Sequence, residues 1–150
     1  MTEPHHVFSA DALVMSDTHG AILLDLEVQG EPRVQERARV LLKNSVPRIY
    51  DPSARLKADF SRAVEQALIS IGLSDFPLFM VQPLKVSVVF NVANMGKDID
   101  NLLKFVMDTL QKLVYNNDRS VHFIECVKHH SPADGSTSIK VEPFVVSASV

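Results

Sequence analysis

The chain has 150 residues, 46% of them hydrophobic, and its formal net charge is −3. These values predict one globular domain with a core of its own and leave no length for a second domain. Every apolar stretch is shorter than the roughly 20 residues of a membrane-spanning helix, so we expect a soluble protein without membrane contact.

Residues 1–20 show weak periodicity, and we predict that they form an N-terminal tail or an extra edge strand ahead of a main domain over residues 21–150. The first basic residue is Arg33, so this segment lacks the basic region of a secretory signal. Cys126 is the only cysteine, which rules out a disulfide within the chain and suits a reducing compartment. We therefore expect a cytoplasmic or nuclear protein that is not secreted.

Residues 21–28 (AILLDLEV) form an apolar run that is followed by Gly30 and Pro32, and they predict a buried strand. Residues 31–44 fit an extended segment better than a helix, because basic and apolar side chains then fall on opposite faces. Residues 33–62 contain eight basic and three acidic side chains, a net charge of +5 that leaves −8 for the rest of the chain. This segment is either a surface that binds a polyanion or an ordinary solvated face.

Residues 51–72 predict the clearest helix of the chain, with Asp51 as N-cap, Pro52 at the first helical position and Gly72 at the end. Apolar side chains recur on one face of this helix, as packing against a core requires. After a loop that contains proline, residues 84–92 alternate between apolar and mostly polar side chains. This alternation predicts a strand with one buried face.

The stretch 97–118 begins K-D-I-D-N-L-L-K and predicts an apolar helix over about residues 101–113. Asp98 and Asp100 lie two residues apart in the lead-in, and in an extended chain their carboxylates would converge on one point. A single aspartate at a helix start is explained by capping and by the helix dipole, which contribute about 0.5–2 kcal/mol. A second acid beside it calls for a positive partner, and carboxylate oxygens are the ligands that Mg²⁺ prefers. Helix capping and a divalent-metal site are therefore both open interpretations.

The same helix carries further charged side chains. Lys104 and Asp108 follow Asp100 at intervals of about one turn and form with it a polar stripe opposite the apolar face. Asp118 comes after the helix and just before the next predicted strand. If the helix packs antiparallel to that strand, we expect Asp118 to return toward the neighbouring strand ends.

Residues 120–128 and 137–146 predict two strands that are joined by a turn-rich segment into a hairpin. Cys126 is expected to pack within the first of these strands. The order strand, helix, strand, helix and hairpin predicts a small single α/β domain of the α+β type, in which two main helices flank a mixed sheet.

The chain resembles the RusA family of Holliday junction resolvases in its pattern D-I-D-N-L-L-K, in the apolar helix that follows, and in N-D-R-S-V ahead of a strand ending near Lys128. Residues 48–60 (RIYDPSARLKADF) also resemble the run from that family's basic loop into its first helix. The resemblance spans residues 22–146. It implies a RusA-like fold and an endodeoxyribonuclease that resolves four-way DNA in recombination and repair, with Mg²⁺ or Mn²⁺ as cofactor.

The resemblance also implies roles for the matching residues. Asp98, Asp100 and Asp118 would be the metal-binding carboxylates of the active site, and Lys104 would be the basic catalytic side chain at the scissile phosphate. Asn117 stands where many members of the family have a further aspartate. The residues that we expect to contact DNA are Arg33, Arg37, Arg39, Arg48, Arg55 and Lys97.

A homodimer is the expected assembly, because a junction is resolved by two symmetric cuts and the chain carries a single D-x-D site. The apolar residues Phe76, Leu78, Phe79 and Met80 are material either for the interface or for the core of one chain. Two alternatives to a junction resolvase stay open. One is a non-catalytic module that binds branched DNA, with the aspartates as helix caps, and the other is a nuclease for flaps or forks.

Overall fold

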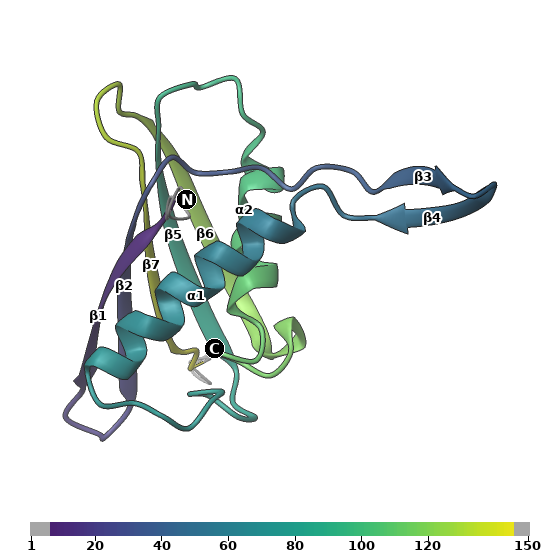
Figure 1. Ribbon diagram of the computed structural model, residues 1–150. Helices are drawn as coiled ribbons and strands as arrows, with labels where there is room; N and C mark the ends of the chain where they lie inside the picture. Colours follow the sequence, from purple (N-terminus) through teal and green to yellow (C-terminus); the bar gives the residue numbers. More distant parts are fainter. Residues whose placement is uncertain (1–6, 146–150) are drawn as a thin grey trace, which may run out of the picture.

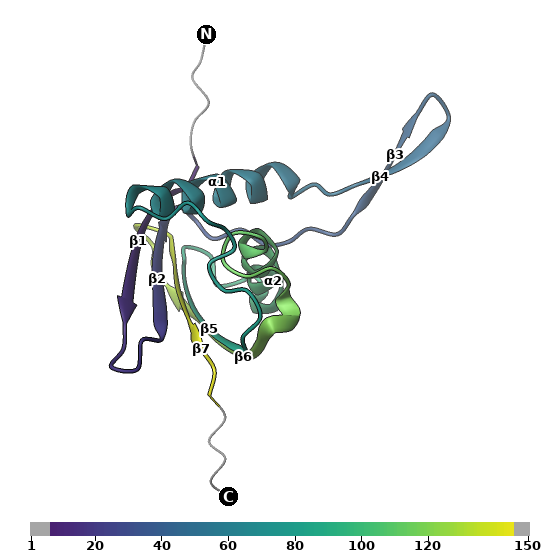
Figure 2. The same ribbon diagram turned by 90° about the horizontal axis from the view of Figure 1, so that it is seen from below.

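A five-stranded mixed sheet forms the centre of the molecule, and two helices pack on one of its faces (Figures 1 and 2). The computed structural model describes residues 7–145. The strands of the sheet are β1 (Ser9–Ser16), β2 (Ile22–Gln29), β5 (Leu84–Val92), β6 (Val121–His130) and β7 (Ser136–Pro143). The helices are α1 (Ala54–Ser70) and α2 (Ile99–Leu110). This architecture confirms the predicted α+β class with a mixed sheet and two main helices.

The core is organised around β5, which lies between β7 and β6. In the strand order β1-β2-β7-β5-β6, β5 and β6 are the one pair of neighbouring strands that run parallel, and the other neighbours are antiparallel. The predicted alternation of β5 is confirmed, because every second residue from Leu84 to Val92 is buried in the core that the helices cover. Neither helix of the described region covers the opposite face of the sheet (Figure 2), as is common for largely antiparallel sheets.

Three aromatic rings join the helix layer to the first strand. The ring of Phe60 in α1 lies 5.1 Å from that of Phe8, just before β1, and 5.8 Å from that of Phe105 in α2. Both contacts are edge-to-face, an arrangement that adds about 0.5–1.5 kcal/mol per pair to the effect of burial. None of the helices within residues 7–145 is long and apolar enough to cross a membrane.

The first helix begins later than its sequence signal predicts, since α1 starts at Ala54 and not at Pro52. The carboxylate of Asp51 accepts a hydrogen bond of 2.8 Å from the backbone N–H of Ser53, so it closes a turn ahead of the helix. Ser53 takes the N-cap position, and its hydroxyl accepts a hydrogen bond of 2.9 Å from the backbone N–H of Glu36. The helix start is thereby attached to the segment that follows β2.

The last two strands are consecutive in the chain but are not neighbours in the sheet. β5 lies between them, parallel to β6 and antiparallel to β7. The predicted hairpin is therefore wrong, and the connecting turn passes over the end of β5, where the Ser131 N–H donates to the Val92 carbonyl at 2.8 Å. The final residue of the predicted strand 137–146 lies outside the described residues.

The N-terminal segment contributes β1, which pairs antiparallel with β2 from Ser9 to Ser16. Residues 1–6 lie outside the described part of the chain. β1 and β6 are accordingly the two outer strands of the sheet.

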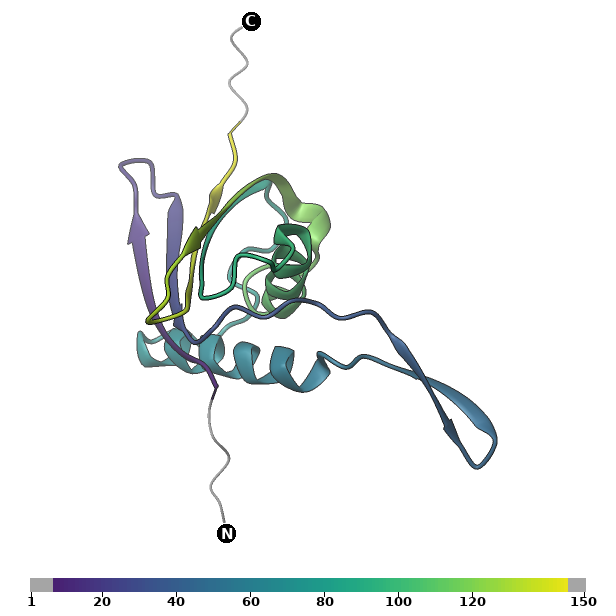
Figure 3. The ribbon, with the colours of Figure 1, turned by 90° about the horizontal axis from the view of Figure 1, so that it is seen from above.

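A separate two-stranded hairpin, which we call the arm, projects from the body between β2 and α1 (Figures 1 and 3). It consists of β3 (Arg39–Lys43) and β4 (Val46–Tyr50), and every residue of both strands is exposed. The predicted extended conformation of residues 31–44 thus becomes a strand only in its last part. Because an isolated hairpin is at best marginally stable in water, the arm is suited to contact with another surface.

The two faces of the arm differ in chemistry, because directly opposed residues of a strand pair share a face. One face carries only apolar side chains, those of Val40, Leu42, Pro47 and Ile49. The other face carries Arg39, Lys43 and Arg48 together with Leu41, Val46 and Tyr50. We call this second side the basic face of the arm.

Candidate functional site

The loop between β5 and α2 leads into Asp98 and is held by a carboxylate from the segment after β2. Glu31 Oε1 accepts hydrogen bonds from the Ala93 backbone N–H at 2.9 Å and from Lys97 Nζ at 3.0 Å. Gly135 leaves room for this carboxylate, because a Cβ atom there would collide with the side chain and backbone of Glu31. Glu31 therefore fixes both ends of the loop over residues 93–97.

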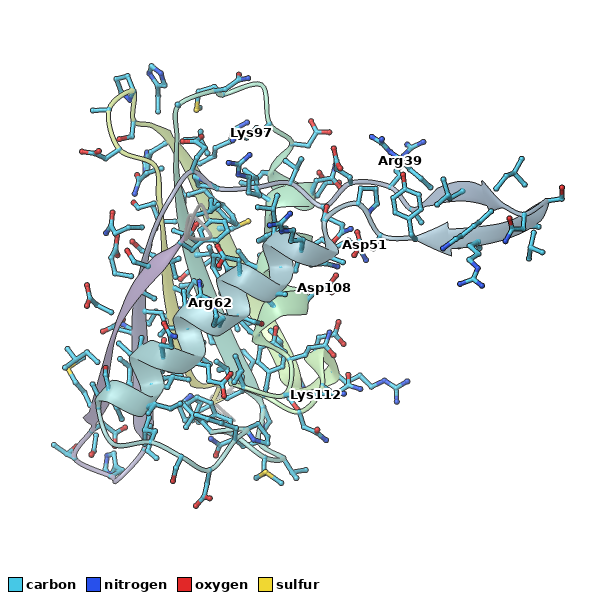
Figure 4. All side chains as sticks on the ribbon, in the orientation of Figure 1. Arg39, Asp51, Arg62, Lys97, Asp108 and Lys112 are labelled. Carbon is cyan, nitrogen blue, oxygen red and sulfur yellow. The ribbon has the colours of Figure 1, made fainter. Side chains whose placement is uncertain are left out.

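Lys97, a predicted DNA contact, has its ammonium group engaged within the chain. Besides its bond to Glu31, Lys97 Nζ donates to the carbonyl oxygen of Pro32 at 2.7 Å, and only 22% of the side chain is exposed. Figure 4 shows Lys97 at the upper end of the helix layer, beside the loop it supports. The charge of Lys97 is thus paired before any DNA binds.

Lys128, near the end of β6, holds the same loop from the other side. Its Nζ atom donates to the carbonyl oxygen of Met95 at 2.6 Å and to that of Lys97 at 2.7 Å. Neither Glu31 nor Lys128 belongs to a spacing pattern with a known chemistry, so the sequence alone assigned no function to them. Only the parallel pairing of β5 with β6 reveals that Lys128 reaches this loop.

The two aspartates of the D-x-D pattern straddle the start of α2. The helix begins at Ile99, earlier than predicted, so Asp98 is the N-cap residue and Asp100 lies in the first turn. The expectation that both carboxylates project from an extended lead-in is wrong, since Asp98 is extended and Asp100 is helical. Asp98 makes no side-chain cap bond, whereas Asp100 Oδ1 accepts a hydrogen bond of 3.0 Å from the Asn101 N–H. Both are exposed at the positive end of the helix dipole, which stabilises negative charge.

A polar pocket of about 370 Å³ lies beside α2 at the base of the arm. The charged side chains in its wall include Arg37, Asp51, Lys57, Lys104 and Asp108. The wall of the pocket therefore consists of the segment ahead of the arm and of side chains from α1 and α2. Such a polar, open hollow suits a charged ligand better than an apolar one.

Lys57 of α1 connects two carboxylates in this pocket. Its Nζ atom forms an ion pair with Asp51 and lies 3.6 Å from Asp108 Oδ2, and Figure 4 shows these two aspartates close together. The hydrogen bond from Lys57 is the main reason that the pKa of Asp51 is lowered. Asp108 is thus paired with Lys57, whereas Lys104 is exposed and has no hydrogen bond or ion pair to any residue between 7 and 145.

Asp118 lies at the other end of α2 from the D-x-D pair. It opens the short 3-10 helix η1 (Asp118–Ser120) just ahead of β6, and the start of β6 is paired with the start of β5. Asp98, in contrast, directly precedes α2, and the chain enters α2 from the end of β5. The grouping of Asp118 with the other two aspartates, which the family resemblance implies, is therefore not formed within a single chain.

Tyr115 fastens the segment that precedes Asp118. Its hydroxyl is fully buried and donates to the Met107 carbonyl oxygen at 2.7 Å. Burial raises the pKa of Tyr115, and the nearby charges of Asp118 and Asp108 raise it further. The phenol accordingly stays neutral and serves the fold.

No group of three or more His, Cys, Asp or Glu side chains placed to hold a metal ion occurs within residues 7–145. Asp98 and Asp100 offer exposed carboxylate oxygens of the hard type that Mg²⁺ and Mn²⁺ bind, but Asp118 is not beside them. One chain by itself does not present the three-carboxylate site that the sequence predicts.

The other predicted DNA contacts gather on the arm and around its base, and all of them are exposed. Arg39 and Arg48 lie on the basic face of the arm, and Arg37 lines the polar pocket. Arg33 comes before the residues that line the pocket in the sequence, and Arg55 lies in the first turn of α1. Together they surround the side of the molecule from which the arm projects.

A protein-family model described as endodeoxyribonuclease RusA matches residues 29–142, which is more than half of the chain. The matched region includes the arm, both helices, β5 and β6, and it leaves out β1 and nearly all of β2. A comparison with curated proteins gave no match. Every side chain that the sequence assigns to the site lies inside the matched region.

Proposed function

Because the chain belongs to the RusA endodeoxyribonuclease family, we propose that it resolves four-way DNA junctions with the aid of Mg²⁺ or Mn²⁺ during recombination and repair. Family membership makes the chain an endodeoxyribonuclease, a hydrolase that acts on DNA phosphodiester bonds, and the family acts on Holliday junctions. The observation that carries the proposal is this match, which covers a D-x-D-N-x-x-K pattern with both aspartates exposed at the start of α2.

We assign the metal to the two aspartates of this pattern, Asp98 and Asp100, and to Asp118. Nucleases of this family depend on divalent metal ions, and carboxylate oxygens are the ligands that Mg²⁺ and Mn²⁺ accept. Asp98 and Asp100 supply such oxygens at one helix start, and Asp118, which one chain keeps apart from them, is the proposed third ligand. This assignment is supported by the residue types and by the exposure of all three.

Lys104 is the proposed partner of the scissile phosphate. It follows Asp100 by about one helical turn, so both lie on the same side of α2. Since Lys57 takes up the charge of Asp108, the ammonium group of Lys104 is left available to an incoming phosphate oxygen. A phosphate held there would lie within one turn of the D-x-D carboxylates.

The basic face of the arm is the proposed surface for the DNA backbone. Arg39 and Arg48 project from a hairpin that stands clear of the body, so they reach DNA beyond the edge of the helix layer (Figure 3). Contacts with phosphates set the position of the protein and give affinity without reading sequence. Selectivity for branched DNA would then come from the positions at which the arms of two chains hold two DNA duplexes.

We also propose a homodimer with two-fold symmetry. Resolution needs two cuts in strands of like polarity, and one chain carries a single D-x-D pattern. A closed isologous dimer supplies two equivalent sites facing one junction.

A second candidate function is a non-catalytic module that binds branched DNA. It is favoured by one observation, namely that Asp98 is an N-cap and Asp100 lies in the first helical turn, where aspartates are stabilising in any helix. The variant Asp100→Asn separates the two functions. A nuclease should lose turnover and keep junction binding, whereas a binding module should keep both its stability and its binding.

The direct test of the proposal compares end-labelled four-way junctions, forks, flaps and linear duplexes in Mg²⁺, in Mn²⁺ and in EDTA. We expect cleavage of the four-way junction in either metal, slower cleavage of the other substrates, and no cleavage in EDTA. Protein that binds the junction but cleaves none of the substrates would support the binding module. Faster cleavage of flaps or forks than of four-way junctions would redirect the assignment to a nuclease for those structures.

A further inference from the structure

Asp108 lies within reach of Lys104 on the same helix. It follows Lys104 by four residues in α2, and side chains at this spacing are neighbours on a helix surface. Opposite charges so placed attract each other, and a carboxylate without another partner would hold the Lys104 ammonium group. In the structure Asp108 is paired with Lys57 of α1 instead, with 3.6 Å between Lys57 Nζ and Asp108 Oδ2. The partner that Asp108 takes therefore determines whether Lys104 is free.

Lys57 is held in this position from the side of the arm. Its ammonium group also pairs with Asp51, which directly follows β4, and only 20% of the Lys57 side chain is exposed. Asp51 Oδ1 in turn accepts hydrogen bonds from the Ser53 backbone N–H at 2.8 Å and from Gln35 Nε2 at 2.9 Å. A side chain that is already ordered by one contact loses little further freedom when it makes a second. Lys57 is therefore placed in advance to take up Asp108.

The contact between the two helices keeps Lys57 level with Asp108. Lys57 and Ser61 are four residues apart, so they lie on the same side of α1. The Ser61 hydroxyl donates a hydrogen bond of 2.7 Å to the carbonyl oxygen of Thr109, the residue after Asp108. Thr109 is buried. The pair of Lys57 with Asp108 is thus part of the packing of α1 on α2, and two flexible surface side chains would not be fixed in this way.

Lys57, Lys104 and Asp108 all line the polar pocket at the base of the arm. A phosphate that reaches Lys104 therefore comes close to Asp108, whose negative charge repels it unless a cation compensates that charge. Lys57 supplies this cation. It favours phosphate binding at Lys104 in two ways, because it removes a competitor for the ammonium group and neutralises a repelling carboxylate.

We propose that Lys57 is a positioning residue for cleavage, which keeps the ammonium group of Lys104 free to bind the scissile phosphate by occupying Asp108. This inference rests on the role proposed above for Lys104. Lys57 acts through Asp108 and touches neither the DNA nor the metal ligands. Without Lys57, Asp108 turns to Lys104, and both the competition and the repulsion oppose binding of the phosphate.

Cleavage by a set of variants tests this role. Single-turnover rates are measured on an end-labelled four-way junction with saturating protein in Mg²⁺. Lys57→Met should lower the rate about tenfold, which corresponds to about 1.4 kcal/mol in the transition state. Asp108→Asn in the same chain should restore most of this loss, because the amide carries no charge to hold Lys104 or to repel a phosphate. A double variant that stays as slow as Lys57→Met would overturn the proposal, because removing Asp108 does not repair a loss of structure.

Two further variants separate the charge of Lys57 from general effects of substitution. Lys57→Arg keeps a cation beside Asp108 and should retain most of the wild-type rate. Lys85→Met removes an ammonium group that is 29% exposed from its ion pair with Glu125 on the sheet, and it should leave the rate unchanged. Equal losses from Lys57→Met and Lys85→Met would contradict the proposal.

Junction binding in EDTA supplies a readout that does not depend on cleavage. Fluorescence anisotropy at several salt concentrations gives the slope of log K against log salt, and each lost phosphate contact lowers this slope by about 0.9 on duplex DNA. Lys57→Met and Lys104→Met should each lower the slope by about 0.9, and their combination should lower it no further. If Lys57 were itself a DNA contact, the two losses would add to about 1.8.

The binding measurement also separates this proposal from the proposed function. In the chain that carries both Lys57→Met and Asp108→Asn, the slope should return to the wild-type value. A slope that stays lowered would overturn the role of Lys57, even where the wild type cleaves junctions as proposed. Conversely, a restored slope in a protein whose wild type binds junctions without cutting them would keep the link between Lys57 and Lys104 and remove the proposed nuclease function.

Discussion

The Nζ atom of Lys128 lies 2.7 Å from the carbonyl oxygen of Lys97. This contact joins the end of β6 to the residue that precedes the N-cap of α2. The same ammonium group also binds the carbonyl oxygen of Met95 at 2.6 Å. The position of Asp98 is therefore set by a side chain from a different strand, in addition to the local signal that starts the helix.

Replacing Lys128 by Met keeps much of the side-chain volume and removes both hydrogen bonds to the loop. We expect the amides of residues 95–97 to exchange faster with solvent and the single-turnover cleavage rate to fall by up to about 100-fold, because small displacements of reacting groups have effects of that size. Lys140→Met, on β7, removes the same charge without touching this loop and should leave both measurements unchanged. Equal losses from the two variants would indicate an effect of charge alone.

Asp98→Asn separates capping from catalysis, since Asn and Asp are nearly equivalent at an N-cap. The free energy of unfolding, measured in urea, should change by less than about 1 kcal/mol, because Asp98 makes no side-chain cap bond and Asn loses only the interaction of the charge with the helix dipole. Junction cleavage should be lost, because the amide lacks the charge of a hard-cation ligand. Asp75→Asn, in the exposed loop ahead of β5, is the matched control. Full activity of the Asp98→Asn variant would show that Asp98 only occupies the N-cap position of α2 and has no role in catalysis.

The arm should account for much of the salt dependence of junction binding. Arg39→Ala combined with Arg48→Ala removes two charges from its basic face, and each lost phosphate contact lowers the slope of log K against log salt by about 0.9 on duplex DNA. We therefore expect a reduction of about 1.8 in fluorescence-anisotropy titrations at several salt concentrations. Lys85→Ala with Lys140→Ala removes the same charge from the sheet. If both double variants change the slope equally, the contact is not at the arm.

Asp51 should make the free energy of unfolding depend on pH in the acid range. Its pKa is lowered, chiefly by the hydrogen bond from Lys57, so the folded chain holds the carboxylate charged below the usual pKa of 3.8. The stabilisation is complete above the unfolded value and is lost as the pH falls through the lower folded value. The difference in unfolding free energy between wild type and Asp51→Asn should therefore be constant from about pH 5 to 8 and shrink below about pH 4. Urea unfolding at each pH measures it, and a difference that persists unchanged at pH 2.5 would rule out this linkage.

Local patterns predicted most elements of this fold, because a helix or strand with one buried face has regularly spaced apolar residues in its sequence. The alternation over residues 84–92 matches β5 in full. The helix over residues 51–72 is also present, although Asp51 closes the preceding turn and the helix starts at Ala54. Helix boundaries shift in this way because several short polar side chains compete for the same free backbone N–H groups.

Relationships between distant segments could not be predicted in the same manner. The pairing of β7 with β5 and β2 leaves no local trace, so two consecutive strands suggested a hairpin that does not form. The same limit applies to the prediction of the site from the sequence. The D-x-D pattern can be recognised because its residues are close together in the sequence. The separation of Asp118 from this pattern depends instead on the length of α2 and on the parallel register of β6 with β5.

Mapping of incisions on a four-way junction shows whether the protein resolves junctions. Each of the four strands is end-labelled in turn, the junction is incubated with wild-type protein in Mg²⁺, and the products are separated under denaturing conditions. We predict paired incisions at symmetry-related positions in two strands of like polarity, and none in EDTA or with Asp98→Asn. A junction that stays intact while fully bound by wild-type protein in Mg²⁺ and in Mn²⁺ would show that the protein is not a junction resolvase.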